Sequence, residues 1–238
     1  MQCGDQLDRG TTEREVLDLF EELRVKAQAA GGAFYPLVGN HQAMNVDLKL
    51  GFVSDTGFAK FADIPYHTND APVMSYPEYK RGRVAAFRPG GPYAKILAQH
   101  SVIFTLEGSI FVHGGVLPAH LTYGIEQINK EISEWMRGNA GRPSLSEIED
   151  ETHPMWSRHY SDNPDEEDCA MLHQVLEATG MDRMVVAHTI QWDDGIHSDC
   201  GGKIWKVDVG LSSHYDEDRL VKPQVLEIVG DVVTVIRG

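Results

Sequence analysis

The amino-acid sequence predicts an α/β fold with mixed strand connections, and two observations lead to that class. Amphipathic helical patterns alternate with short apolar runs typical of strands along the 238 residues, and glycine-containing or polar turns separate them. Two pairs of strand-like runs are joined by turns short enough for β-hairpins. The sequence contains no internal repeat and no Ser/Gly-rich linker, so we predict a single domain over residues 1–238.

The first predicted helix follows the threonine pair at 11–12. The apolar residues Val16, Leu17, Phe20 and Leu23 recur at helical spacing, and the glycines at 31–32 end the helix. A second helix is expected to begin near Ala43. Residues 51–92 have only a weak pattern, which predicts loops and short helices. Further helices are expected over residues 92–99, 123–136 and 165–179.

Short β-rich runs predict the strands. Residues 101–105 and 109–113 flank Glu107-Gly108, and residues 224–229 and 232–236 flank Gly230-Asp231, so both pairs are predicted hairpins. Single strands are expected over residues 34–38, 183–188 and 203–209. A strand should also precede the glycine at position 4, and residues 1–3 are what the sequence offers for it.

The composition narrows the classes of partner. A formal net charge of -15 argues against binding to a nucleic acid backbone or to an anionic membrane surface. No apolar run approaches the roughly 18 residues of a membrane-spanning helix. Acidic clusters at residues 147–151 and 162–168 are interpreted as solvated loops and helix N-termini. The sequence makes no prediction about oligomeric state.

The three cysteines, Cys3, Cys169 and Cys200, are an odd number and lack CxxC spacing. They favour a reducing compartment, cytoplasmic or organellar, and argue against a disulfide framework or a zinc knuckle. Cys200 is therefore expected to be a plain thiol. No signal peptide is visible, and a targeting segment ahead of Met1 is left open.

Four predicted strands end in turns that carry side chains able to bind metal ions: Asp5, the pair Asn40-His41, His113 and His188. Sites in open α/β sheets assemble at the carboxyl ends of strands, so we expect these groups to share a site. Carboxylate, amide and imidazole donors suit manganese, iron or zinc better than calcium. Two such ions would activate a bridging water and clamp a phosphoryl group.

Each group also has a plain structural interpretation. A histidine after a strand is more often a surface or hydrogen-bonded core residue than a ligand. Asp8 could simply form the turn, and Arg158 could serve a structural salt bridge. His197 and His214 have no motif around them and are expected at the surface.

Taken together, the motifs resemble those of phosphoprotein phosphatases within the calcineurin-like metallophosphoesterases, and most closely the Shewanella-like protein phosphatase branch. The resemblance runs in matching order from residue 4 to about residue 210 and implies a metallophosphoesterase-type αββα sandwich with mixed β-sheets. It is carried by GDQLDRG (4–10), GNHQAMN (39–45), FVHGGVLP (111–118), INKEISEW (128–135), PMWSR (154–158) and AH (187–188).

The resemblance implies metal ligands. Asp5 would bridge two divalent metals, which are manganese, iron or zinc in the family. Asn40, His113 and His188 would complete the shell of the second metal.

The resemblance also implies catalytic roles. His41 would protonate the leaving alkoxide, and Asp8 would orient His41. Arg9 and Arg158 would hold the phosphate oxygens, with Asn40 also at the phosphate.

The sequence departs from the family pattern at two places. The family's first motif, Gly-Asp-x-His-Gly, is absent, so one metal site has its full set of protein ligands and the other has only Asp5. We therefore expect the first strand to be missing and the fold to be N-terminally incomplete. Gln42 stands where the family usually has Glu, and we expect it to tune activity by bonding to His41 or to a water molecule.

Two functions from different classes follow. The first is a dinuclear metal-dependent phosphomonoesterase that acts on a phosphorylated protein or phosphopeptide, with phosphoserine, phosphothreonine and phosphotyrosine all open. The second is a catalytically impaired pseudophosphatase that keeps one metal and acts as a binding or scaffold protein. A nucleotide diphosphate hydrolase is a third interpretation, which segments 111–118 and 156–158 disfavour.

Overall fold

Five short strands form a mixed parallel and antiparallel sheet, which confirms the predicted α/β class. The structure is a computed structural model and describes residues 1–143, 151–215 and 222–238. The strand order is β1-β2-β3-β5-β4, with β2, β3 and β5 parallel and with β1 and β4 antiparallel to their neighbours. The bounds are β1 Ile103–Leu106, β2 Ser109–Val112, β3 Arg183–Val186, β4 His197–Asp199 and β5 Ile204–Lys206.

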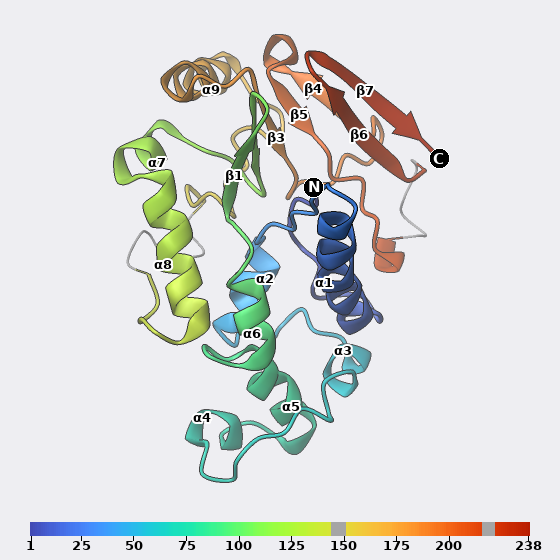
Figure 1. The fold of residues 1–238 in the computed structure, drawn as a ribbon, viewed down its shortest axis with the longest axis vertical. Coiled ribbons are helices and arrows are strands. Elements are labelled where there is room, and N and C mark those ends of the chain that lie inside the picture. Colours follow the sequence, from blue (N-terminus) through green and yellow to red (C-terminus); the bar gives the residue numbers. More distant parts are fainter. Residues whose placement is uncertain (144–150, 216–221) are drawn as a thin grey trace. The chain divides into compact units, whose positions relative to one another are not determined.

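The chain divides into two compact units. The first contains Met1–Ser101 and Lys130–Ser144, and the second contains Val102–Asn129 and Leu145–Gly238. The sheet belongs wholly to the second unit. The first unit is mainly helical, with α1 Glu13–Ala29, α2 Asn40–Val46, α3 Asp55–Ala59, α4 Ala71–Met74, α5 Glu78–Phe87 and α6 Pro92–Leu97 (Figure 1).

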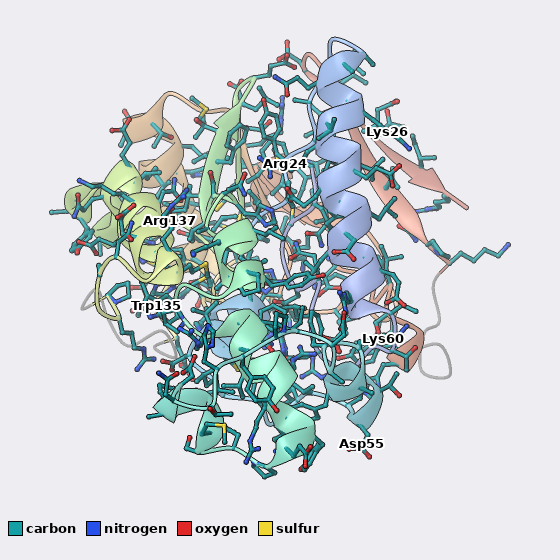
Figure 2. All side chains as sticks on the ribbon, turned by 60° about the horizontal axis from the view of Figure 1, so that its bottom comes forward. Arg24, Lys26, Asp55, Lys60, Trp135 and Arg137 are labelled. Carbon is teal, nitrogen blue, oxygen red and sulfur yellow. A yellow bond between two sulfur atoms is a disulfide. The ribbon has the colours of Figure 1, made fainter. Side chains whose placement is uncertain are left out.

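Helix α1 confirms the first predicted helix. Its amphipathic pattern buries Leu17, and its C-terminal half carries Arg24 and Lys26, both labelled in Figure 2. Each of these cations pairs with a glutamate one turn earlier, Arg24 with Glu21 at 2.6 Å and Lys26 with Glu22. Such pairs on a helix surface stabilise it by about 0.2–0.5 kcal/mol each.

Helix α2 begins at Asn40, three residues before the predicted start. The difference arises because Gly39 takes the extended N-cap position and its N–H donates to the Gln42 side-chain oxygen at 2.8 Å. Asn40 and His41 therefore lie in the first turn of a helix. All seven residues of α2 are buried.

The extended segments of the first unit are shorter than predicted. A single parallel bridge, Gln2 with Pro36, joins residues 1–3 to residues 34–38, and another, Leu37 with Ser101, joins residues 34–38 to residue 101. Leu37 N–H donates to the Gln2 carbonyl at 2.8 Å, but Pro36 has no N–H with which to extend the ladder.

The second unit carries α7 (Pro118–Tyr123), the first turns of α8 (Ile125–Arg137) and α9 (Glu166–Thr179). The helix predicted over residues 123–136 is confirmed as α8, which begins two residues later, whereas α7 was not predicted. Gly124 has φ of 105°, outside the helical region, and separates α7 from α8. Helix α9 is confirmed, with Asp165 accepting from two N–H groups of its first turn and Gly180 left-handed at its end.

Both predicted hairpins are confirmed. Strands β1 and β2 pair antiparallel around Glu107-Gly108. Strands β6 (Gln224–Val229) and β7 (Val232–Arg237) form a separate two-stranded sheet, visible beside β4 and β5 in Figure 1. Strand β4 was not predicted, because its polar sequence His-Ser-Asp is extended only through pairing with β5.

The expectation that Cys169 and Cys200 are free thiols is wrong. The two form a disulfide with their Cα atoms 5.3 Å apart, joining α9 to the 3-10 turn Cys200–Gly202. Cys3, which lies outside this pair, is half-buried. The number and spacing of the cysteines did not predict this disulfide, because the two residues are 31 positions apart and meet only through tertiary packing.

Two further findings bear on the composition. Within the described parts of the chain, no helix combines the length and apolarity needed to cross a membrane. The acidic cluster at 162–168 leads into the first turn of α9, as predicted. Most of the other cluster, residues 147–150, lies outside the described residues.

Candidate functional site

The loop at residues 4–10 has an unusual backbone. Asp5, Asp8 and Arg9 have φ of 59°, 74° and 60°, and Gly4 has φ of 94°. Left-handed conformations at residues other than glycine are costly, of order 1–3 kcal/mol each, and persist only where the surroundings fix them. The turn therefore presents two carboxylates and a guanidinium in a geometry that neighbouring groups must hold in place.

The N-terminus of α2 holds Asp5. The Asp5 N–H donates to the Gln42 Oε1 at 3.0 Å, and the His41 N–H donates to the Asp5 Oδ1 at 3.1 Å. A Cβ at Gly39 would lie 2.3 Å from Asp5 Oδ1, so the position requires glycine. A helix N-terminus favours a carboxylate in this position.

Gln42 differs from its predicted role. Its Oε1 accepts from Asp5 and Gly39, and its Nε2 donates to the Gln6 Oε1 at 2.5 Å. The hydrogen bonds found for this side chain thus fasten the 4–10 loop rather than reaching the His41 ring. The amide supplies a donor toward Gln6 that a glutamate would lack.

His41 and Asp8 form a buried pair. The His41 Nδ1 lies 2.6 Å from the Asp8 Oδ2, and the side-chain exposures are 6% and 0%. With Nδ1–H donating to the carboxylate, Nε2 is left to face other groups. The Arg9 Nη1 lies 3.3 Å from this Nε2. The Phe52 ring supports both, 4.9 Å from the Arg9 guanidinium and 5.3 Å from the imidazole.

Behind this pair lies a buried polar network that the sequence did not indicate. Arg83 of α5 and Asn45 of α2 both donate to the Asp8 Oδ1, at 3.2 Å and 2.9 Å. Residue 83 falls within the stretch 51–92, where the pattern is weak. An arginine in that context carries no signal of burial, so only the fold brings it to Asp8.

In the second unit, two predicted metal ligands meet. His113 follows β2 and His188 follows β3, and the His113 Nε2 lies 3.1 Å from the His188 Nδ1. The rings meet edge to face with centroids 5.0 Å apart. The adjacent, parallel strands bring these two turns together, and the Ala187 N–H donates to the His113 carbonyl at 2.9 Å.

The glycines after His113 allow a close approach of the chain. The N–H groups of Gly114 and Gly115 donate to the Pro154 carbonyl at 2.8 Å and 3.0 Å. A Cβ at Gly114 would lie 2.8 Å from backbone atoms of both Pro154 and Ser157. The HGG motif therefore packs against the segment that carries Arg158.

Arg158 lies beside His188. Its Nη1 donates to the His188 carbonyl at 3.1 Å and to the Thr189 hydroxyl at 2.7 Å. The side chain is exposed, so the guanidinium is held at the surface next to one of the two histidines. Both of these bonds go to uncharged oxygens.

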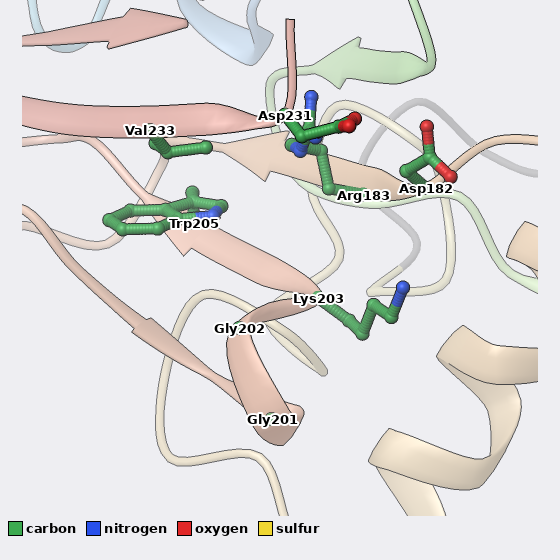
Figure 3. Close-up of a pocket in the computed structure, with 8 residues that line it drawn as sticks. All are labelled: Asp182, Arg183, Gly201, Gly202, Lys203, Trp205, Asp231 and Val233. Carbon is green, nitrogen blue, oxygen red and sulfur yellow. The ribbon is translucent and has the colours of Figure 1, made fainter.

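A depression of about 320 Å³ lies elsewhere on the second unit (Figure 3). Its lining includes Arg183 at the start of β3 and Lys203 just before β5. His113 and His188 follow the ends of their strands, so this hollow is at the opposite strand ends from them.

The predicted site residues thus form two groups. Asp5, Asp8, Arg9, Asn40 and His41 lie together in the first unit, and His113, Arg158 and His188 lie together in the second. His197, by contrast, is part of β4, and His214 is exposed.

Comparison with known proteins identifies relatives of this arrangement. The family model described as calcineurin-like phosphoesterase matches residues 1–191. Shewanella-like protein phosphatase 2 of Arabidopsis thaliana is 33% identical over 97% of this chain and 66% of its own length. An uncharacterised protein of Schizosaccharomyces pombe is 29% identical over 93% of this chain and 64% of its own length. The chain thus spans about two thirds of the length of either relative.

Solved structures agree in fold. A cold-active protein-tyrosine phosphatase of a psychrophilic Shewanella species has a TM-score of 0.64 at 22% identity, over 87% of this chain and 59% of that one. A second structure of a cold-active protein tyrosine phosphatase has a TM-score of 0.65 at 20% identity, with 87% and 58% covered. The resemblance recognised from the motifs is confirmed.

Proposed function

Because the chain belongs to the calcineurin-like phosphoesterase family, we propose that it is a metal-dependent phosphomonoesterase whose substrates are phosphorylated proteins. The observation that carries this proposal is the buried His41–Asp8 pair, in which Nδ1 lies 2.6 Å from Oδ2, with Arg9 beside the His41 Nε2. A proton donor next to a guanidinium is what cleavage of a phosphate ester requires of the protein.

The donor set fits divalent metal ions. Two imidazole nitrogens 3.1 Å apart, at His113 and His188, suit manganese, iron or zinc, as does a carboxylate at Asp5. We propose Asp5, Asn40, His113 and His188 as the ligands. When bound, the metal ions lower the pKa of water for attack and neutralise charge on the phosphoryl group.

The remaining residues handle the proton and the phosphate. His41 would give a proton from Nε2 to the leaving oxygen, while Asp8 keeps Nδ1 protonated and the ring fixed. Arg9 would turn from Nε2 to a phosphate oxygen when substrate binds, which frees Nε2 for its task. Arg158 would donate hydrogen bonds to a second phosphate oxygen, since a planar guanidinium matches phosphate geometry.

The substrate class rests on the relatives. The Arabidopsis thaliana protein is named a protein phosphatase, which supports a phosphoprotein substrate here. The non-catalytic alternative is not proposed, because the comparisons give it no support.

The direct test is release of p-nitrophenol from p-nitrophenyl phosphate by the full chain with added manganese. We expect manganese-dependent turnover that falls by about 100-fold or more in His41→Ala, the scale of a lost general acid. His214→Ala, an exposed histidine without a motif, should match the wild type. Equal rates for the wild type and His41→Ala would refute the proposal.

A further inference from the structure

Arg83 is a fully buried arginine in the first unit. It lies on α5, and its guanidinium packs against the rings of Phe61 and Phe87, 5.2 Å and 5.1 Å from their centroids. Burying a charged group away from water costs free energy unless each of its hydrogen-bond donors finds an acceptor. A buried arginine must therefore have specific partners.

The partners of Arg83 converge on Asp8. The Arg83 Nη2 donates to the Asp8 Oδ1 at 3.2 Å, and the Nε donates to the Asn45 Oδ1 at 2.9 Å. The Asn45 Nδ2 in turn donates to the same Asp8 oxygen at 2.9 Å. Arg83 thus reaches Asp8 twice, once directly and once through Asn45.

The other donors of Arg83 fix its own plane. The Nη2 also donates to the Glu13 Oε2 at 2.7 Å, and the Nη1 donates to the Gly57 carbonyl at 3.0 Å. Partners from α1, α2, α3 and the 4–10 loop therefore fix the orientation of the planar Arg83 guanidinium. A lysine could keep the charge but could not satisfy these directions at once.

The consequence for Asp8 is that both carboxylate oxygens are committed. Oδ1 receives Arg83 and Asn45, so Oδ2 is turned toward the His41 Nδ1. The same bonds hold Asp8 in its left-handed backbone conformation, φ 74°. Without them the carboxylate could rotate, and the ring of His41 would lose its fixed orientation and its fixed tautomer.

We propose that Arg83, together with Asn45, is a positioning residue: it orients Asp8 so that His41 keeps its proton on Nδ1 and directs Nε2 at the leaving group. The proposal deepens the proposed phosphatase function and rests on it for its catalytic consequence. Arg83 itself would touch neither the phosphate nor the reacting atoms.

The first test does not need activity. In protein labelled with ¹⁵N-histidine, the His41 Nδ1–H should give a proton signal protected from solvent exchange, assigned by its loss in His41→Ala. Arg83→Lys should abolish or broaden this signal. Arg14→Lys is the matched control, because Arg14 also lies near Phe61 and bonds a carboxylate, that of Asp63, but has no bond to Asp8.

The second test compares leaving groups. 2,4-Dinitrophenolate departs without a proton, whereas phenolate needs one. Arg83→Lys should lower kcat on phenyl phosphate by about tenfold or more, and kcat on 2,4-dinitrophenyl phosphate by less than threefold. In a His41→Ala background the same substitution should have no further effect on the ratio of the two rates.

The outcomes separate cleanly. An unchanged Nδ1–H signal in Arg83→Lys, absence of the signal in the wild type, or an equal rate loss on both substrates would overturn the positioning role. A wild type that shows the signal and its dependence on Arg83 but hydrolyses no aryl phosphate would remove the proposed function instead. If Arg83→Lys does not fold, Asn45→Ala, which removes one of the two bonds to Asp8 Oδ1, decides by the same measurements.

Discussion

His120 is a buried histidine whose titration should be visible in the folding equilibrium. Its side chain lies on α7, 6% exposed, and its Nδ1 accepts from the Leu117 N–H at 2.9 Å. Burial lowers the pKa of His120 to about 4, against the smaller opposing effect of a hydrogen bond with the Thr152 backbone. A protonated Nδ1 would also face the Leu117 N–H, donor against donor.

The sign of the pH dependence follows from this lowered pKa. Between pH 6.5 and pH 4 the unfolded chain binds a proton at residue 120 and the native chain does not, so stability falls as the pH falls. From pH 7 to pH 5 we expect a loss of about 2 kcal/mol from this residue. Urea unfolding at both pH values measures this change. From pH 7 to pH 5, the free energy of unfolding of His120→Gln should fall by about 2 kcal/mol less than that of the wild type.

The control for this prediction is His214→Gln, an exposed histidine. This variant should lose as much free energy of unfolding between pH 7 and pH 5 as the wild type does. Identical losses in His120→Gln and the wild type would contradict the assignment.

The link between α9 and the turn Cys200–Gly202 is the main covalent constraint among the described elements. Helix α9 is capped at both ends by its own sequence, with Asp165 at the start and Gly180 at the end. The 3-10 turn is different, because Cys200 and Gly201 have φ of 50° and 67°, left-handed values that its sequence alone does not enforce. The disulfide restrains this turn from outside.

Reduction of Cys169–Cys200 should therefore destabilise the protein. Closing a loop of about 31 residues in the unfolded chain is worth about 3–4 kcal/mol in the chain-entropy model. Urea unfolding with and without dithiothreitol should show a loss of this order, and Cys169→Ser should reproduce it without reductant. Cys3→Ser, which changes the cysteine outside the Cys169–Cys200 bond, should respond to dithiothreitol as the wild type does. No response in the wild type would mean that the bond does not form.

For the molecule as a whole, metal binding should couple to folding. The proposed ligands are spread from residue 5 to residue 188, so the unfolded chain cannot present them together, and an ion that binds only the native state stabilises it by mass action. The formal charge of -15 adds a general attraction for cations.

We therefore expect manganese to raise the thermal unfolding midpoint in a concentration-dependent way. A concentration 100 times the Kd corresponds to about 2.7 kcal/mol. His113→Ala should remove most of this shift, whereas His214→Ala should keep it. If both variants keep the full shift, the manganese is bound by surface carboxylates and the proposed ligand set is wrong.

Local sequence determined much of this protein. Helix α9 is bounded by Asp165 and Gly180, both hairpins follow from their two-residue turns, and the motifs at residues 4–10, 39–45 and 111–118 reveal the family. Each of these signals acts over a few residues, through backbone conformation or a hydrogen bond to a near neighbour.

Only the tertiary structure decided the rest. Arg83 reaches Asp8 across 75 positions, Cys169 meets Cys200 across 31, and β4 is a strand because β5 pairs with it. None of these residues differs in its local pattern from a solvated arginine, a free thiol or a polar loop. Their roles depend on burial and on partners distant in the sequence. The motif at residues 4–10 thus suggests the chemistry by itself, whereas the contact of the buried Arg83 with its Asp8 exists only in the folded chain.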